Sequence, residues 1–310
     1  MRYMVAIVIL VFALSRGTQR VLTSLALDSL DGWSVTALSL SFACLIWLPI
    51  AWYRKWLVFD KSLWLRSIPL GIVNITIPAV AFTFAQLFVT AGVAALFVAF
   101  LPVVVAILGW VFLRERLSIK VWVGVFLATV GVAVLTVGKN GALDVSNWWA
   151  GIGLLAVGVL SAAIVYVGWR KLLSERPAVE LLAPQLVIST LCVLPLAFLL
   201  GDMNIPSIEI WFLLGALGTV NYIIPQIAMF WLLVRTTAVR SSLANYLAPV
   251  FAIILGALVL DQTITWLIIV GGILIILGAV FVNTAKLKNR LQNYPILLLW
   301  ILLLAVKTVF

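Results

Sequence analysis

Two arginines in the first apolar stretch of the chain are the residues best suited to bind a charged ligand. Arg16 and Arg20 are four residues apart, so they lie on one face of a helix. An arginine near the centre of a bilayer costs about 2.5 to 3.5 kcal/mol, so such a side chain should face a water-filled cavity or a partner. Guanidinium groups bind carboxylates and phosphates in bidentate fashion. The pair therefore predicts a binding site for the acidic group of an organic molecule.

The negative partner of these arginines is not evident in the sequence. Every Asp and Glu falls in an expected loop or at the end of an apolar stretch, so a bound anion would supply the missing charge. In the alternative interpretation, Arg20 extends to the outer surface, and backbone carbonyls with Gln185 or Asn74 satisfy Arg16. Both interpretations remain open at the level of sequence.

Other polar and aromatic side chains are expected near the middle of the membrane. Asn74 and Asn221 each precede a proline by four residues, and Pro78 and Pro225 each free a backbone carbonyl one turn earlier. The asparagines are expected to satisfy that break or to line a cavity. For any one of these residues, an interhelical hydrogen bond worth about 0.6 kcal/mol is an equally good explanation. The expected substrate-binding residues are Arg16, Gln19, Arg20, Asn74, Tyr166, Gln185, Asn221, Tyr222 and Asn245.

The sequence lacks the residue sets that catalysis or metal binding requires. It contains no histidine, and its two cysteines, Cys44 and Cys192, lie in the middle of apolar stretches. Such cysteines are expected to be small apolar fillers rather than a disulfide pair or metal ligands. We therefore expect no catalytic residues, no metal, no cofactor and no enzymatic activity.

Composition identifies the class of protein. Of the 310 residues, 65% are hydrophobic and 10% are charged, and the mean hydropathy is +1.26, far outside the range of soluble proteins. The chain is therefore expected to be an all-α polytopic membrane protein. Its net charge of +10 comes from Lys and Arg in short loops, which indicates membrane topology rather than nucleic-acid binding.

Apolar stretches of about 20 residues predict the membrane-spanning helices. With the N-terminus in the cytoplasm, nearly all loop Lys and Arg fall inside, and Lys139 is the basic residue expected outside. The expected helices are 4–25, 33–53, 64–87, 91–113, 119–137, 149–169, 179–200, 208–234, 241–260 and 265–282.

An internal repeat divides these ten helices into two halves. At an offset of 147 residues, Pro102 aligns with Pro249, Gly109 with Gly256, and Asn74 with Asn221. An odd number of helices per half reverses the second half in the membrane, so an inverted repeat is expected, with a substrate site between the halves near the midplane. The expected units are 1–140 and 148–284, followed by a C-terminal apolar segment, 291–310. That segment is expected to be either an eleventh helix or an interfacial helix.

Glycines spaced by seven form an expected close-packing seam in the fifth helix of each half. These residues are Gly124, Gly131, Gly271 and Gly278. The seam is compatible with packing within one chain or between two copies, so a homodimer stays open.

Motifs around the fourth helix of each half resemble those of a known family. Thr90 to Leu96 (TAGVAAL), followed by Pro102, Gly109 and Glu115 and repeated more loosely from Thr237 to Ile264, resembles the paired EamA domains of the drug/metabolite transporter superfamily. The resemblance covers almost the whole chain. It implies ten helices in two inverted five-helix units, a central cavity and alternating access. Members of this superfamily move amino acids, sugar phosphates, nucleotide sugars, drugs and other metabolites.

These observations predict a secondary, non-ATP transporter that exports or exchanges a small anionic or zwitterionic metabolite such as an amino acid. A lipid-linked carrier or flippase, or a drug exporter of the same fold, is the alternative. The expected partners are the small-molecule substrate and membrane lipids, with no nucleic acid. Analogy with the family favours the inner membrane of a prokaryote as the location.

Overall fold

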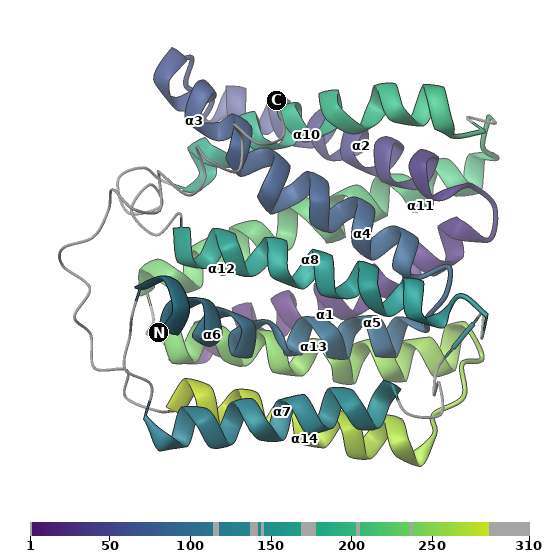
Figure 1. The fold of residues 1–310 in the computed structure, drawn as a ribbon. Helices are drawn as coiled ribbons and strands as arrows, with labels where there is room; N and C mark the ends of the chain where they lie inside the picture. Colours follow the sequence, from purple (N-terminus) through teal and green to yellow (C-terminus); the bar gives the residue numbers. More distant parts are fainter. Residues whose placement is uncertain are drawn as a thin grey trace.

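A computed structural model of the chain describes residues 2–113, 118–136, 142–143, 146–168, 178–202, 205–235 and 238–284. Within these ranges the regular structure is helical, apart from an isolated antiparallel bridge between Val89 and Ala142. The helices run side by side in one bundle (Figure 1). The expected C-terminal segment, 291–310, lies outside the described residues.

The first half of the chain forms helices where apolar stretches predict them. Asp31 and Thr90 accept hydrogen bonds from backbone N–H groups in the first turns of the helices that follow them, which fixes where those helices begin. The third expected helix contains a π-helical turn, and the fourth divides near Phe100, two residues before Pro102. The elements are α1 (Arg2–Leu27), α2 (Gly32–Tyr53), α3 (Lys61–Gly71), η1 (Ile72–Thr76), α4 (Ile77–Ala85), α5 (Ala91–Ala99), α6 (Leu101–Leu113) and α7 (Ile119–Thr136).

The second half repeats this order with one difference. Its third helix again contains a π-helical turn, at the position that the 147-residue offset predicts, whereas its fourth helix passes Pro249 without dividing. The elements are α8 (Trp148–Gly168), α10 (Ala178–Leu200), α11 (Ile208–Gly218), η3 (Thr219–Ile223), α12 (Ile224–Arg235), α13 (Ala238–Val259) and α14 (Trp266–Thr284).

Length and composition make the chain a multi-pass membrane protein. Among the described residues, seven helical stretches are long and apolar enough to cross a membrane. Three shorter apolar helices, Ile119–Val134, Ala248–Val259 and Trp266–Gly278, account for the remaining expected spans. A count of ten spans therefore depends on these three.

Helices of the two halves are interleaved rather than packed as two separate bodies. The first helix of each half packs on the other half: α1 contacts α12 and α13, and α8 contacts α4 and α6. Two pairs of equivalent helices also meet directly, α2 with α10 and α7 with α14, and Figure 1 shows α7 and α14 side by side at one edge of the bundle.

Glycine permits the closest of these approaches. A Cβ atom added to Gly131 would lie 2.8 Å from the Gly271 carbonyl oxygen, and one added to Gly278 would lie 2.5 Å from the Gly124 carbonyl oxygen. The expected glycine seam thus packs within one chain, between α7 and α14. The contacts are reciprocal, because the 147-residue offset relates Gly131 to Gly278 and Gly124 to Gly271 and so turns one contact into the other.

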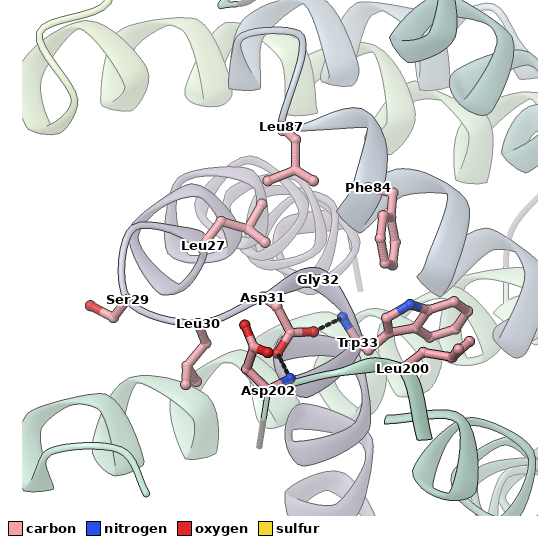
Figure 2. A pocket seen from close by; sticks show the side chains of 10 residues that line it. All are labelled: Leu27, Ser29, Leu30, Asp31, Gly32, Trp33, Phe84, Leu87, Leu200 and Asp202. Carbon is pink, nitrogen blue, oxygen red and sulfur yellow. Dashed lines mark hydrogen bonds between the residues drawn. The ribbon is translucent and has the colours of Figure 1, made fainter. Parts of the chain in front are cut away.

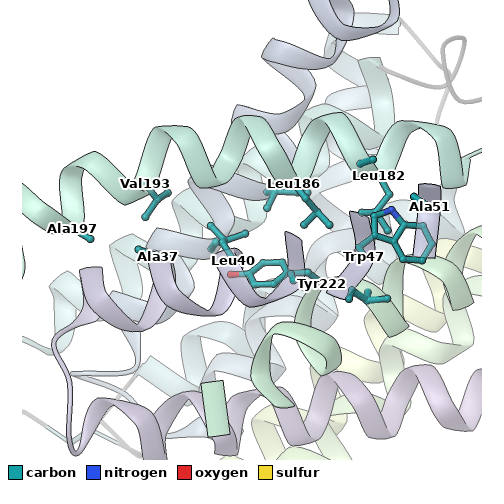
Figure 3. Close-up of a cluster of buried hydrophobic side chains, with 14 residues drawn as sticks. Ala37, Leu40, Trp47, Ala51, Leu182, Leu186, Val193, Ala197 and Tyr222 are labelled. Atoms are coloured by element: carbon teal, nitrogen blue, oxygen red, sulfur yellow. The ribbon is translucent and has the colours of Figure 1, made fainter. Parts of the chain in front are cut away.

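A buried apolar cluster holds α2, α10 and η3 together. Its large members include Trp47 and Leu40 of α2 and Leu182 and Leu186 of α10, all less than 2% exposed. Tyr222 of η3 belongs to the same cluster (Figure 3). This packing fixes the π-turn that carries Asn221 and Tyr222.

Candidate functional site

Arg20 is the most deeply buried charged side chain of the expected site. Only 3% of its surface is exposed, and its guanidinium carbon lies 4.4 Å from the ring centroid of Phe82 in α4. A cation over an aromatic face gains about 0.5 to 2 kcal/mol, which offsets only part of the cost of burial. Within the described part of the chain, the Arg20 Nη1 atom has no hydrogen-bond partner. The side chain therefore does not extend to the outer surface, as the alternative interpretation had it.

Arg16 lies one turn earlier on the same face of α1 and is half-buried. Its Nη1 atom donates to the Gln19 Oε1 atom at 3.3 Å, and its guanidinium carbon lies 5.6 Å from the ring centroid of Phe12. Gln19 is 4% exposed. The three predicted polar residues of α1 thus form one cluster along a single helix face.

Tyr222 adds a hydroxyl group from the other half of the chain to this cluster. Its ring is 7% exposed, its hydroxyl shares a hydrogen bond with Ser39 of α2, and it interacts electrostatically with both Arg16 and Arg20. A phenol hydroxyl beside two guanidinium groups is suited to bind the oxygen of an acid. The structure thus brings together the predicted residues of α1 and Tyr222.

Asn74 and Gln185 form a second polar pair, between η1 and α10. The Asn74 Nδ2 atom donates to the Gln185 Oε1 atom at 2.7 Å, and the Gln185 Nε2 atom donates to the Leu181 carbonyl at 2.9 Å. The side chain of Asn74 therefore does not close the backbone break that Pro78 leaves. The observed bond is the interhelical contact that was the alternative explanation for Asn74, and a role in lining a cavity stays a prediction.

The remaining predicted site residues are less closely defined. Asn221 is half-buried in η3, next to Tyr222. Tyr166 lies in α8 and Asn245 in α13, and the side chains of both fall outside the described residues.

A pocket of about 570 Å³ opens at the end of α1 that follows Arg20 (Figure 2). Leu27 of α1 and Phe84 of α4 line it, and Arg20 and Phe82, which contact each other, belong to the same two helices. Two carboxylates, Asp31 and Asp202, give the pocket a negative character. The lining residues are Leu27, Ser29, Leu30, Asp31, Gly32, Trp33, Phe84, Leu87, Leu200 and Asp202.

The carboxylate of Asp31 is held in its charged form. Burial raises the pKa of Asp31, but hydrogen bonds from the Ser34 hydroxyl and from the backbone N–H groups of Ser34, Asp202 and Trp33 outweigh it and leave the pKa below its ordinary value. The pocket therefore keeps this negative charge at neutral pH. Leu27, which also lines the pocket, is seven residues, about two turns of α1, beyond Arg20.

Two contacts of the site carry no sequence signal that reveals them. Phe82 is one apolar residue among many in its stretch, and no pattern distinguishes the ring that faces Arg20. Ser39 lies in a helix with several small hydroxyl residues, which are common in membrane helices for packing alone.

Comparison with protein families and curated proteins places the chain among transporters. The EamA-like transporter family matches residues 3–137 and 149–284. An "uncharacterized transporter" of Archaeoglobus fulgidus is 25% identical over 231 residues, covering 72% of this chain and 80% of that protein. A "probable terminal-alkyne amino-acid exporter" of Streptantibioticus cattleyicolor is 26% identical over 277 residues, covering 84% of this chain and 88% of that protein.

The fold also matches solved structures. The crystal structure of another protein superposes with a TM-score of 0.66 at 17% identity, covering 91% of this chain and 96% of the other. At this identity the likeness shows the fold alone. With both halves matched by the same family, the chain belongs to the EamA-like transporter family.

Proposed function

We propose that the chain is a secondary transporter that moves a small organic anion or zwitterion, with amino acids as the first candidate class. The main support for the proposal is the buried and incompletely bonded guanidinium group of Arg20. This group is buried on Phe82 with its Nη1 atom unbonded among the described residues, and the titratable groups that act on it are Arg16, which repels it, and Tyr222, an uncharged phenol at neutral pH; neither is a carboxylate. A carboxylate of the substrate would complete this site.

The charge of the pocket favours a zwitterion over a simple anion. Asp31 and Asp202 would repel an anion that enters through the pocket, whereas the ammonium group of an amino acid offsets that repulsion. The named activity of the Streptantibioticus relative, amino-acid export, agrees with this choice at 26% identity.

We further propose ten spans in two inverted five-helix units, with the N-terminus in the cytoplasm of a prokaryotic cell. The reciprocal contacts of Gly131 with Gly271 and of Gly278 with Gly124 support this arrangement, because units related by a two-fold axis repeat each contact between the equivalents of its two partners. The interleaved contacts of α1 and α8 suggest that the bodies that rock during alternating access each contain helices from both halves.

A thermal-shift experiment on the detergent-purified protein tests the substrate class. We expect amino acids or organic carboxylates to raise the apparent melting temperature of the wild type, because a ligand that binds the folded state stabilises it by mass action. Arg16→Gln and Arg20→Gln should remain folded and lose the response. Stabilisation by organic cations alone, or an unchanged response in both variants, would exclude the proposed site.

A further inference from the structure

Two π-helical turns leave equivalent backbone carbonyls without a donor from their own helix. In η1 the Ile77 N–H bonds the Ile72 carbonyl, five residues earlier, and in η3 the Ile224 N–H bonds the Thr219 carbonyl in the same way. The next residue along is a proline in both cases and has no N–H. With bonds that span five residues, Pro78 would donate to the Val73 carbonyl and Pro225 to the Val220 carbonyl, so these two carbonyls lack a donor from their own helix.

A serine hydroxyl from the other half of the chain takes the place of each missing donor. Ser161 of α8 donates to the Val73 carbonyl at 2.6 Å, and Ser15 of α1 donates to the Val220 carbonyl at 2.6 Å. The two serines are 5% and 6% exposed. They lie 146 residues apart, one fewer than the 147-residue offset that relates Val73 to Val220, so the two bonds join closely corresponding places in the two halves and are reciprocal.

We propose that Ser15 and Ser161 are positioning residues that fix the first helix of each half against the π-turn of the other. Ser15 directly precedes Arg16, and Val220 directly precedes Asn221 and Tyr222. The Ser15 bond therefore sets the placement of Arg16 relative to Tyr222 across the boundary between the halves. That this placement matters for substrate binding rests on the proposed function. The two hydrogen bonds, and the pairing of each bond with a proline, are independent of it.

The pairing of each serine with one proline gives a test that needs no ligand. Ser15→Ala should lower the apparent melting temperature of the purified full-length protein by about 2 to 4 °C. In a Pro225→Ala background, residue 225 has a backbone N–H again, and this group can bond the Val220 carbonyl. Ser15→Ala should then lower the melting temperature by less than half as much as it does in the wild-type background. Ser161→Ala should show the same dependence on Pro78→Ala.

Crossed combinations are the matched control. Ser15→Ala in a Pro78→Ala background, and Ser161→Ala in a Pro225→Ala background, should give additive effects, because the partners belong to different bonds. Ser67→Ala should change the melting temperature little, because its buried hydroxyl donates to the Leu63 carbonyl of its own helix. Additive effects in the matched pairs would overturn the proposal.

An isosteric pair covers the case in which a proline variant fails to fold. Ser15→Thr keeps the hydroxyl and Ser15→Val removes it, while both add the same bulk. The threonine variant should melt at a higher temperature than the valine variant, and equal values would overturn the proposal. Failure of the amino-acid proposal would leave these results unchanged, since no ligand is present.

Discussion

At the scale of single residues, the candidate site combines a buried guanidinium group that has an unbonded nitrogen, within the described part of the chain, with polar groups that bond each other. Arg20 retains an unbonded nitrogen, whereas Asn74 and Gln185 bond each other across the halves. A group that is fully paired within the protein contributes to packing, and a buried group that is not paired is available to a ligand. On this distinction we propose that Arg20 binds the substrate, whereas Asn74 makes an interhelical contact.

A double-mutant cycle on Asn74 and Gln185 tests the second assignment. Asn74→Leu should destabilise the protein by about 0.6 kcal/mol, the average for interhelical hydrogen bonds in membranes, and by at most about 1.7 kcal/mol, the largest value for such bonds. With Gln185→Leu already present the loss should be smaller, because the bond no longer exists. Thermal unfolding measures both values, and full additivity would show that the two amides do not interact.

Asp31 gives a prediction for the dependence of stability on pH. Its folded pKa lies below the ordinary value of 3.8, so its stabilising effect is complete above the unfolded pKa and is lost as the pH falls through the folded pKa. Asp31→Asn should therefore melt at a lower temperature than the wild type at pH 7. Asparagine also serves as an N-cap residue, so the difference in melting temperature measures the charge-assisted part of these hydrogen bonds rather than the whole cap.

The wild-type and Asp31→Asn melting curves should converge as the pH falls below about 4. Asp28→Asn, an exposed change three residues earlier, is the control and should follow the wild type across the range. A constant difference between Asp31→Asn and the wild type down to pH 3 would contradict the account.

At the scale of helices, the contact between α7 and α14 depends on glycine. Gly131→Ala would place a Cβ 2.8 Å from the Gly271 carbonyl oxygen and the Ile275 backbone nitrogen, so the helices must separate. We expect a loss of about 1 to 3 kcal/mol, the usual range for overpacking. Gly153→Ala is the matched control, because its added Cβ meets nothing within 4 Å. Equal melting temperatures for the two variants would show that the seam tolerates a side chain.

Apolar stretches predict the helices well because each must be long enough to cross a bilayer. The expected helix 33–53 is observed as Gly32–Tyr53, and 119–137 as Ile119–Thr136. The π-turns could not be predicted, because a proline fits either a kinked α-helix, which frees the carbonyl four residues earlier, or a π-turn, which frees the one five residues earlier. The sequence therefore indicates a break before Pro78 but not which carbonyl it frees.

At the scale of the whole molecule, the repeat in the sequence predicts which residues are equivalent but not which residues touch. The 147-residue offset relates η1 to η3, yet α1 packs on α12 and α13 of the other half. Contacts between halves depend on how the units associate, and a linear pattern of apolar residues carries no such information. For the same reason, Arg16 and Arg20 stand out in the sequence, whereas Phe82 and Ser39 do not.

Transport by the reconstituted protein tests the central claim, that Arg20 binds the acidic group of a transported amino acid. Uptake of a radiolabelled amino-acid mixture into proteoliposomes would be compared for the wild type, Arg20→Gln and Arg54→Gln. Arg54 is a suitable control because its guanidinium also lies over an aromatic ring, 6.0 Å from the centroid of Trp56, but is exposed. We predict uptake by the wild type and Arg54→Gln and at least a tenfold loss in Arg20→Gln, the equivalent of about 1.4 kcal/mol. Equal uptake by Arg20→Gln, or wild-type uptake no greater than that of protein-free liposomes, would contradict the account.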